Sequence, residues 1–75
     1  MYWGEIMIKF VLNNSKLNSI PIIIVYQKGD EITQRKIKVN RIDKGIIQAY
    51  CYKRRSIRNF KMENVLAAIK IKSIN

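Results

Sequence analysis

Basic side chains with no acid among them occupy two short segments of the chain, and they are the residues best suited to do chemistry. The segments hold Arg35, Lys36, Lys38 and Arg41, and then Lys53, Arg54, Arg55, Arg58 and Lys61. Tyr50 and Tyr52 lead directly into the second segment. Arginine clamps phosphate through paired hydrogen bonds, and aromatic faces stack on bases. The pattern predicts a surface that binds single-stranded nucleic acid or a nucleotide-type ligand.

The net charge of the whole chain also favours an anionic ligand. Lysine and arginine number 15 against 5 acidic residues, which gives a net charge of +10. Such an excess draws anions toward a protein, and nucleic acid is the commonest anionic partner. The alternative is that these charges only keep a β-rich domain soluble and unaggregated.

Residues typical of catalysis are scarce. The chain has no histidine and a single cysteine, Cys51, which alternates with Ile47 and Ala49 as a core residue would. Asp30, Glu31 and Asp43 fall in expected turns, where acidic residues are common for local reasons. We therefore expect a protein that is not an enzyme and that holds no metal or cofactor.

The first residues have the spacing of a helix. Apolar residues recur at i, i+3, i+4, i+7 and i+8 from Trp3 through Ile6, Met7, Phe10 and Val11. Glu5 suits the first helical turn, and Asn13-Asn14-Ser15 is a plausible end. The spacing predicts a helix over residues 3–13 that covers a sheet, with an additional β-strand as the alternative.

The remainder of the chain alternates with the period of β-strands. The expected strands are 20–27, 31–42, 46–53, 56–62 and 66–73, joined mostly by hairpins. The last strand is expected to turn Ala67, Ile69 and Ile71 inward, with Lys70 and Lys72 outward. A curled sheet or small barrel would bury one apolar face and remove most edges. We expect one domain over residues 1–75, with the barrel at 20–73.

Arg35 and Arg58 are the most informative basic residues because each shares a strand face with expected core residues. Arg35 alternates with Ile37, and Arg58 alternates with Phe60. A charge on the apolar side needs a partner or must emerge at the rim of the barrel. The two explanations are a buried salt bridge and a rim that faces a ligand, and we favour the rim.

No segment marks the chain for a membrane or for export. Glu5 and Lys9 interrupt the apolar start, and no apolar run approaches the ~20 residues that span a bilayer. A lone cysteine gives no internal disulfide. We expect a cytoplasmic protein.

Five short segments, taken in order, resemble the WYL domain family of bacteria over residues 4–73. After the helix come Ile22-Ile23-Ile24-Val25-Tyr26, Thr33-Gln34-Arg35-Lys36-Ile37, Ile47-Gln48-Ala49-Tyr50-Cys51 and Arg58-Asn59-Phe60-Lys61-Met62. The Trp-Tyr-Leu triplet, from which the family takes its name, corresponds to Gly45-Ile46-Ile47 in this chain. Its two aromatic residues are therefore absent here. The usual winged-helix segment is absent from the sequence, so we expect a free-standing domain.

The resemblance implies an SH3-like or Sm-like five-stranded antiparallel β-barrel with an N-terminal helix. It also implies a role in transcription regulation through binding nucleic acid or nucleotide-type ligands. Tyr26, Arg35, Tyr50, Arg58 and Phe60 match the family pattern, with Phe60 in the core and the two arginines on the ligand. The expected binding residues are Arg35, Tyr50, Tyr52, Lys53, Arg54, Arg55, Arg58 and Lys61. The alternative function is a protein–protein interaction or dimerisation module whose charge only supports solubility.

Overall fold

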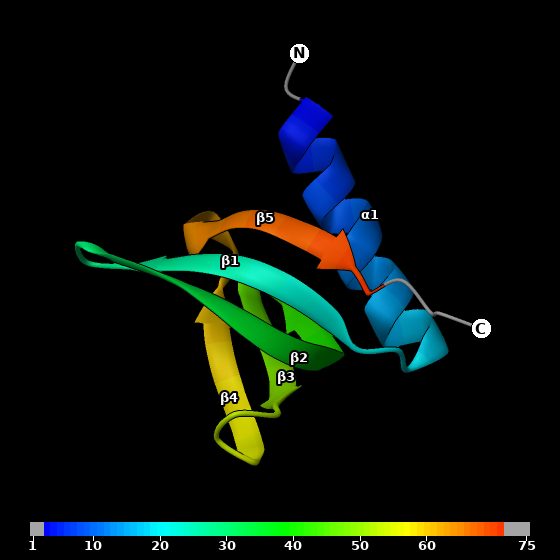
Figure 1. Ribbon diagram of the computed structural model, residues 1–75. Coiled ribbons are helices and arrows are strands. Elements are labelled where there is room, and N and C mark those ends of the chain that lie inside the picture. Colours follow the sequence, from blue (N-terminus) through cyan, green and yellow to red (C-terminus); the bar gives the residue numbers. More distant parts are fainter. Residues whose placement is uncertain (1–2, 72–75) are drawn as a thin grey trace.

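The computed structural model describes residues 3–71, with side chains from residue 6 onward, and consists of one helix and five strands (Figure 1). The elements are α1 (Trp3–Asn18), β1 (Ile22–Lys28), β2 (Glu31–Asp43), β3 (Ile46–Cys51), β4 (Ser56–Lys61), the 3-10 turn η1 (Met62–Asn64) and β5 (Val65–Lys70). The strands form one antiparallel sheet in the order β4-β3-β2-β1-β5. The predicted mostly-β, barrel-like class with an N-terminal helix is confirmed.

The sheet curls along β2, which pairs with a different neighbouring strand in each of its two halves. Its first half pairs with β1, up to Ile22 opposite Ile37, and its second half pairs with β3, from Cys51 opposite Ile37. The register shifts between Val39 and Arg41, and a bulge of this kind increases the local bend and twist. Because β3 pairs with β2 only from Ile37 onward, the tip of the β1–β2 hairpin projects beyond the rest of the sheet (Figure 1).

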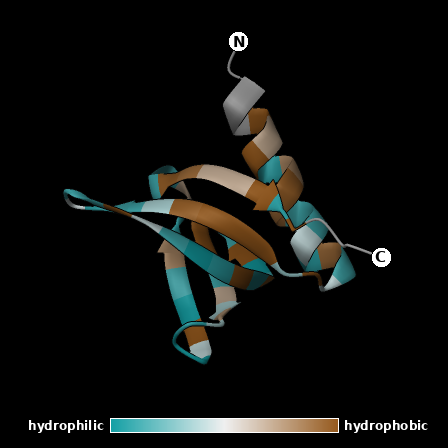
Figure 2. Ribbon diagram, viewed as in Figure 1, coloured by the Kyte–Doolittle hydropathy of each residue, from teal (hydrophilic) through white to brown (hydrophobic). Residues whose placement is uncertain are grey.

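One face of the curled sheet carries the core, as the period-two alternation predicts. The hydropathy colouring shows apolar stretches along β1 and β3 (Figure 2). The buried apolar residues are Val11, Leu12, Ile22, Ile24, Ile37, Val39, Ile47, Ala49, Cys51, Phe60 and Val65. The predicted inward faces of β3 and of the second half of β2 are therefore correct, and Phe60 lies in the core as expected.

Cys51 is fully buried among these residues, and its thiol is free. A buried thiol reacts only when the surrounding structure opens. We expect a thiol reagent to label Cys51 slowly in the native protein and rapidly in denaturant, which mass spectrometry can follow. Rapid labelling under native conditions would contradict the inward register of β3.

The helix differs from the prediction in length and in the face that it buries. It extends to Asn18, beyond the Asn13-Asn14-Ser15 end expected from sequence. Val11, which belongs to the expected face, is buried together with Leu12 and Ser15, and Ile8 is partly buried. The other described members of that face, Ile6, Met7 and Phe10, are about half exposed. The side chains of Trp3 and Glu5 lie outside the described residues. The helix was predicted correctly, but its orientation was not.

Ser15 does not end the helix, and its hydroxyl joins α1 to the sheet. The Oγ atom donates to the carbonyl of Ile20 at 2.6 Å and accepts from the backbone N–H of Val39 at 3.0 Å. Val39 precedes the bulge in β2, and both Ser15 and Val39 are buried. A serine that looked like a helix stop is a buried contact between helix and strand.

Replacing Ser15 with alanine is expected to lower the free energy of unfolding by about 1–3 kcal/mol, because the buried N–H of Val39 would lose its acceptor. Asn13→Ala, at an exposed position of the same helix, is the matched control. Urea unfolding of both variants gives the comparison. Equal effects of the two substitutions would show that the hydroxyl contributes nothing specific.

The inward face of β5 is also different from the prediction. Val65 is buried opposite Tyr26, but a register shift between Val25 and Tyr26 then places Ala67 opposite Val25. The shift reverses the alternation, so Ala68 and Lys70 lie on the core side and Ile69 is half exposed. The Nζ atom of Lys70 lies 5.1 Å from the centre of the Phe10 ring on α1. The predicted inward set of Ala67, Ile69 and Ile71 is wrong, and Lys72 lies outside the described residues.

Candidate anion-binding pocket

The core face of three strands continues outward into polar and cationic residues. On β1, buried Ile24 is followed on the same face by Tyr26 and Lys28, and Arg35 on β2 lies opposite Ile24. On β4, Arg58 shares the face of buried Phe60. Because β4 is paired with neither β1 nor β2, these inward side chains emerge at the rim of the barrel, between β4 and the β1–β2 hairpin.

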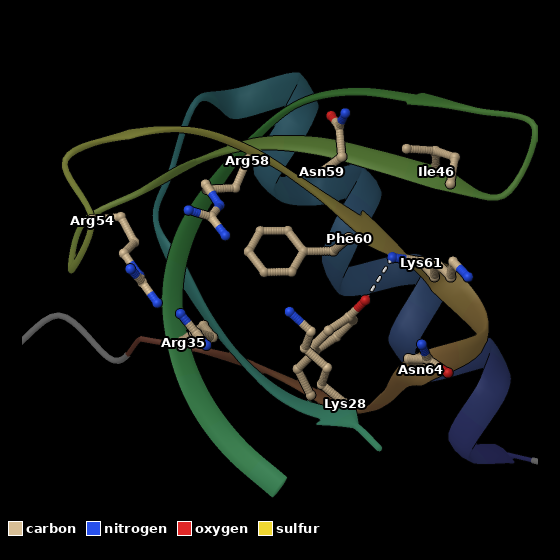
Figure 3. Close-up of a pocket in the computed structure, with 10 residues that line it drawn as sticks. Lys28, Arg35, Ile46, Arg54, Arg58, Asn59, Phe60, Lys61 and Asn64 are labelled. Carbon is tan, nitrogen blue, oxygen red and sulfur yellow. Dashed lines mark hydrogen bonds between the residues drawn. The ribbon is translucent and has the colours of Figure 1, made fainter. Parts of the chain in front are cut away.

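These side chains line a pocket of about 340 Å³ between β4 and the β1–β2 hairpin, drawn in Figure 3. We call it the seam pocket. It is lined by Tyr26, Lys28, Arg35, Ile46, Arg54, Arg58, Asn59, Phe60, Lys61 and Asn64. Its volume lies at the small end of the ~300–1,000 Å³ range typical of small-molecule sites.

The seam pocket is strongly cationic. Five of its lining residues are lysine or arginine and none is acidic. Among the side chains described, from residue 6 onward, one ion pair is found, between Arg41 and Asp43 at 3.6 Å, and both side chains are well exposed. Within that described part of the chain, neither Arg35 nor Arg58 forms a salt bridge, and both line this pocket. That the rim faces a ligand stays a prediction.

Arg35 is held so that its terminal groups remain available. Its Nε atom donates to the hydroxyl of Thr33 at 3.3 Å, which fixes the side chain along β2. The guanidinium fork presents further N–H donors beyond Nε. In Figure 3 the ends of Arg35, Arg54 and Arg58 gather on one side of the Phe60 ring, while Lys61 and Asn64 lie on the other.

Two aromatic residues, Tyr26 and Phe60, form the apolar floor of the seam pocket. The rings of Tyr26 and Phe60 meet edge to face, with centres 5.1 Å apart and planes at 81°. The hydroxyl of Tyr26 accepts a hydrogen bond from the backbone N–H of Lys61 at 3.0 Å, shown as the dashed line in Figure 3. A phenol that accepts in this way still has its own proton to donate. The floor therefore offers one neutral donor beside the cations.

The free edge of β4 supplies a backbone donor. Alternate residues of an antiparallel strand point their backbone groups to opposite sides. The N–H of Lys61 points away from β3, toward Tyr26, so the N–H of Asn59 points the same way. In the described sheet β4 is an edge strand, and no strand pairs with that side. The backbone of Asn59 is thus open to a ligand.

The structure divides the predicted binding residues between two places. Arg35, Arg54, Arg58 and Lys61 line the seam pocket, whereas Tyr50, Tyr52, Lys53 and Arg55 do not. Tyr50 pairs with Ile57 on the outer face of the sheet, opposite the face of Arg58. Tyr50 therefore does not share a face with Arg58, although both were expected on one binding surface.

The two tyrosines pack with each other and with a lysine. The rings of Tyr50 and Tyr52 meet edge to face with centres 5.1 Å apart. The Nζ atom of Lys36 lies 5.0 Å from the centre of the Tyr52 ring. Contacts from both neighbours reduce the ring area of Tyr52 available for stacking on a base. The strand preference of tyrosine for a half-buried pleated surface accounts for these residues.

Six of the ten lining residues were not among the expected binding residues: Tyr26, Lys28, Ile46, Asn59, Phe60 and Asn64. Tyr26 and Lys28 could have been found, because they continue the alternation that begins at Ile24. Asn59 and Ile46 line the pocket from β4 and β3. Asn64 lies in η1, where no strand period applies, and nothing in the sequence singled it out.

No protein-family model matches the chain, and no curated protein matches it. Among solved structures, proteasome accessory factor B/C (PafBC) of Arthrobacter aurescens is similar with a TM-score of 0.78 and 18% sequence identity. The match supports a WYL-like fold. It covers 97% of this chain and 12% of that chain, so the present chain spans a small part of the length of PafBC.

Two further observations bear on the kind of site. Among the described residues, no three histidine, cysteine, aspartate or glutamate side chains lie close enough to hold a metal ion. A search of the same residues also found no helix with the length and apolar content needed to cross a membrane.

Proposed function

We propose that this chain is a non-enzymatic, regulatory ligand-binding module that holds a phosphate-bearing ligand, single-stranded nucleic acid or a nucleotide, in the seam pocket. The observation that carries the proposal is the convergence of five cationic side chains, with no acidic residue, around one small pocket. These cations come from β1, β2, β4 and the turn after β3. A surface charged only for solubility has no reason to gather its cations around a concavity.

The donor types of the seam pocket suit phosphate. Three arginines can each offer paired N–H donors to phosphate oxygens, and the open N–H of Asn59 adds a backbone donor. The long-range field of a chain with net charge +10 would also speed the approach of an anionic ligand. Similarity to PafBC, a regulator that contains WYL domains, supports a regulatory role for such binding.

The absence of catalytic machinery is part of the proposal. A chain without histidine lacks the most common general base, and its cysteine is buried in the core. No acidic residue lines the seam pocket to move a proton. The chemistry that remains is binding.

A salt-dependent titration tests the proposal. Fluorescence anisotropy with labelled single-stranded DNA and RNA, at about 50 mM and about 200 mM salt, measures the affinity and its salt slope. We expect measurable binding whose logarithmic affinity falls by about 0.7 units per phosphate contacted for each tenfold rise in salt, which is about 0.4 units between these two concentrations. Double-stranded DNA is the comparison, because a narrow pocket should not admit a duplex. Failure of both single strands and of free nucleotides to bind would contradict the proposal.

A second candidate, a protein–protein contact, rests on the exposed face of α1. Ile6, Phe10 and Leu17 follow at i, i+4 and i+11 on the side away from the core, with exposed fractions of 50%, 54% and 76%. Exposed apolar patches often mark interaction sites. Sedimentation of the protein over a range of concentrations and salt tests self-association. Association that does not respond to salt would favour this candidate, and a monomer throughout would exclude dimerisation.

A further inference from the structure

We propose that the seam pocket recognises a terminal phosphate, the phosphomonoester at the end of a nucleic acid strand or on a free nucleotide, rather than a phosphodiester inside a strand. This inference rests on the proposed function and narrows its ligand. It follows from the size of the pocket, from its charge and from the arrangement of its arginines.

The size of the pocket limits the ligand to a short unit. Its volume is about 340 Å³, whereas folds that track single strands hold roughly 4–16 nucleotides along an open groove. Phe60 closes the floor and is only 6% exposed, so little aromatic area is available for stacked bases. The pocket therefore suits one nucleotide unit and is a poor track for a strand.

The charge of the pocket exceeds what one internal nucleotide brings. Five cations surround the space, whereas a phosphodiester carries a single negative charge. A phosphomonoester carries about 1.5–2 negative charges at neutral pH and presents three terminal acceptor oxygens. Because cations crowded together repel one another, the ligand with the higher charge density relieves more of that repulsion.

The arginines are placed for such a group. Arg35, Arg54 and Arg58 come from β2, from the turn after β3 and from β4, and their ends gather on one side of Phe60 (Figure 3). Each guanidinium presents several donors in one plane, so three of them can share the oxygens of one phosphate. Lys61 and Asn64, on the other side, would then face the sugar and base.

A set of matched oligonucleotides separates the two kinds of phosphate. The probes are a short oligothymidylate with a 5′-phosphate, the same with a 3′-phosphate, and the same with hydroxyl groups at both ends. We expect at least one phosphorylated probe to bind about tenfold more tightly than the hydroxyl-ended probe. Thymidine monophosphate and thymidine form a second pair, and tight binding of the free nucleotide would identify it, rather than a strand end, as the sufficient ligand.

The pH dependence of the affinity is an independent test of whether the bound group is a phosphomonoester. The second proton of a phosphomonoester is lost near pH 6, and the chain has no histidine to titrate in the same range. The charged groups lining the pocket from each element are all cationic: Lys28, Arg35, Arg54, Arg58 and Lys61. We expect affinity for the phosphorylated probe to fall about threefold from about pH 7.5 to about pH 5.5, as the dianion is protonated. The hydroxyl-ended probe, measured in parallel, controls for any response of the protein.

Two neighbouring arginines provide the matched variants. Arg54 lines the seam pocket and Arg55 does not. Arg54→Ala should reduce the preference for the phosphorylated probe severalfold, whereas Arg55→Ala should leave it unchanged. Measurable and equal affinity of all three oligonucleotides would overturn this inference and leave the proposed function standing. Failure of every probe to bind would overturn both.

Discussion

Arg58→Ala is expected to weaken oligonucleotide binding by about 1–3 kcal/mol while leaving the melting temperature nearly unchanged. Arg58 is exposed at the rim of the seam pocket, and the described residues give it no salt bridge to lose. Its removal therefore takes donors from the ligand and little from the fold. The salt slope should become shallower by about the amount that one phosphate contact contributes.

Arg55→Ala is the matched control for this variant, because it removes the same charge from the turn next to the pocket without altering the lining. Titration and thermal unfolding are measured on both proteins. If Arg58→Ala and Arg55→Ala weaken binding equally, binding depends on diffuse charge and the seam pocket has no specific role. A large fall in melting temperature for Arg58→Ala would instead reveal a structural function.

Leu12→Ala should lower the free energy of unfolding by about 2–5 kcal/mol, the usual loss for a buried leucine. Leu12 is fully buried on the face of α1 that meets the sheet. A chain of 75 residues has a total stability of roughly 4–11 kcal/mol by the usual per-residue rule. This single change is therefore expected to leave the protein close to unfolding.

Leu17→Ala makes the same chemical change on the same helix at a side chain that is 76% exposed. It is expected to alter the stability by less than about 0.5 kcal/mol. Urea unfolding of the two variants thus tests which face of α1 is buried. Similar losses for both would show that the helix also packs through its outer face, as an association between molecules would require.

Strand alternation allowed most of the fold to be predicted from sequence. The inward faces of β3 and of the second half of β2 follow from residues such as Ile47 and Val39, because side chains of a strand alternate strictly. The errors occur where strict periodicity is lost. A register shift between Val25 and Tyr26 reversed the face of β5, and a shift of this kind leaves no mark in the pattern of apolar residues.

The helix face was misjudged for a related reason. α1 is apolar on two sides, so spacing alone admits both the face of Ile6 and Phe10 and the face of Val11 and Leu12. On the face that is buried, the hydroxyl of Ser15 accepts a hydrogen bond from Val39, 24 positions away in the sequence. Such a tertiary hydrogen bond cannot be deduced from helical spacing.

The candidate site was predictable only in part. Arg35 and Arg58 were recognised because a cation on a core face must reach the rim, and both line the seam pocket. Tyr50 and Tyr52 were grouped with them by closeness in sequence, yet the ladder places Tyr50 on the opposite face. Closeness along a strand does not place side chains on one surface, because neighbours point to opposite faces.

The most direct test of a ligand site in the seam pocket is a map of backbone amide shifts by nuclear magnetic resonance during titration with a short single-stranded oligonucleotide. A ligand in the seam pocket should produce its largest shift changes at lining residues, namely Arg35, Arg58, Asn59, Lys61 and Asn64. The outer face, reported by Lys36, Lys38 and Tyr50, should change little. Shifts concentrated on that outer face, or spread evenly over all basic residues, would contradict a site in the seam pocket.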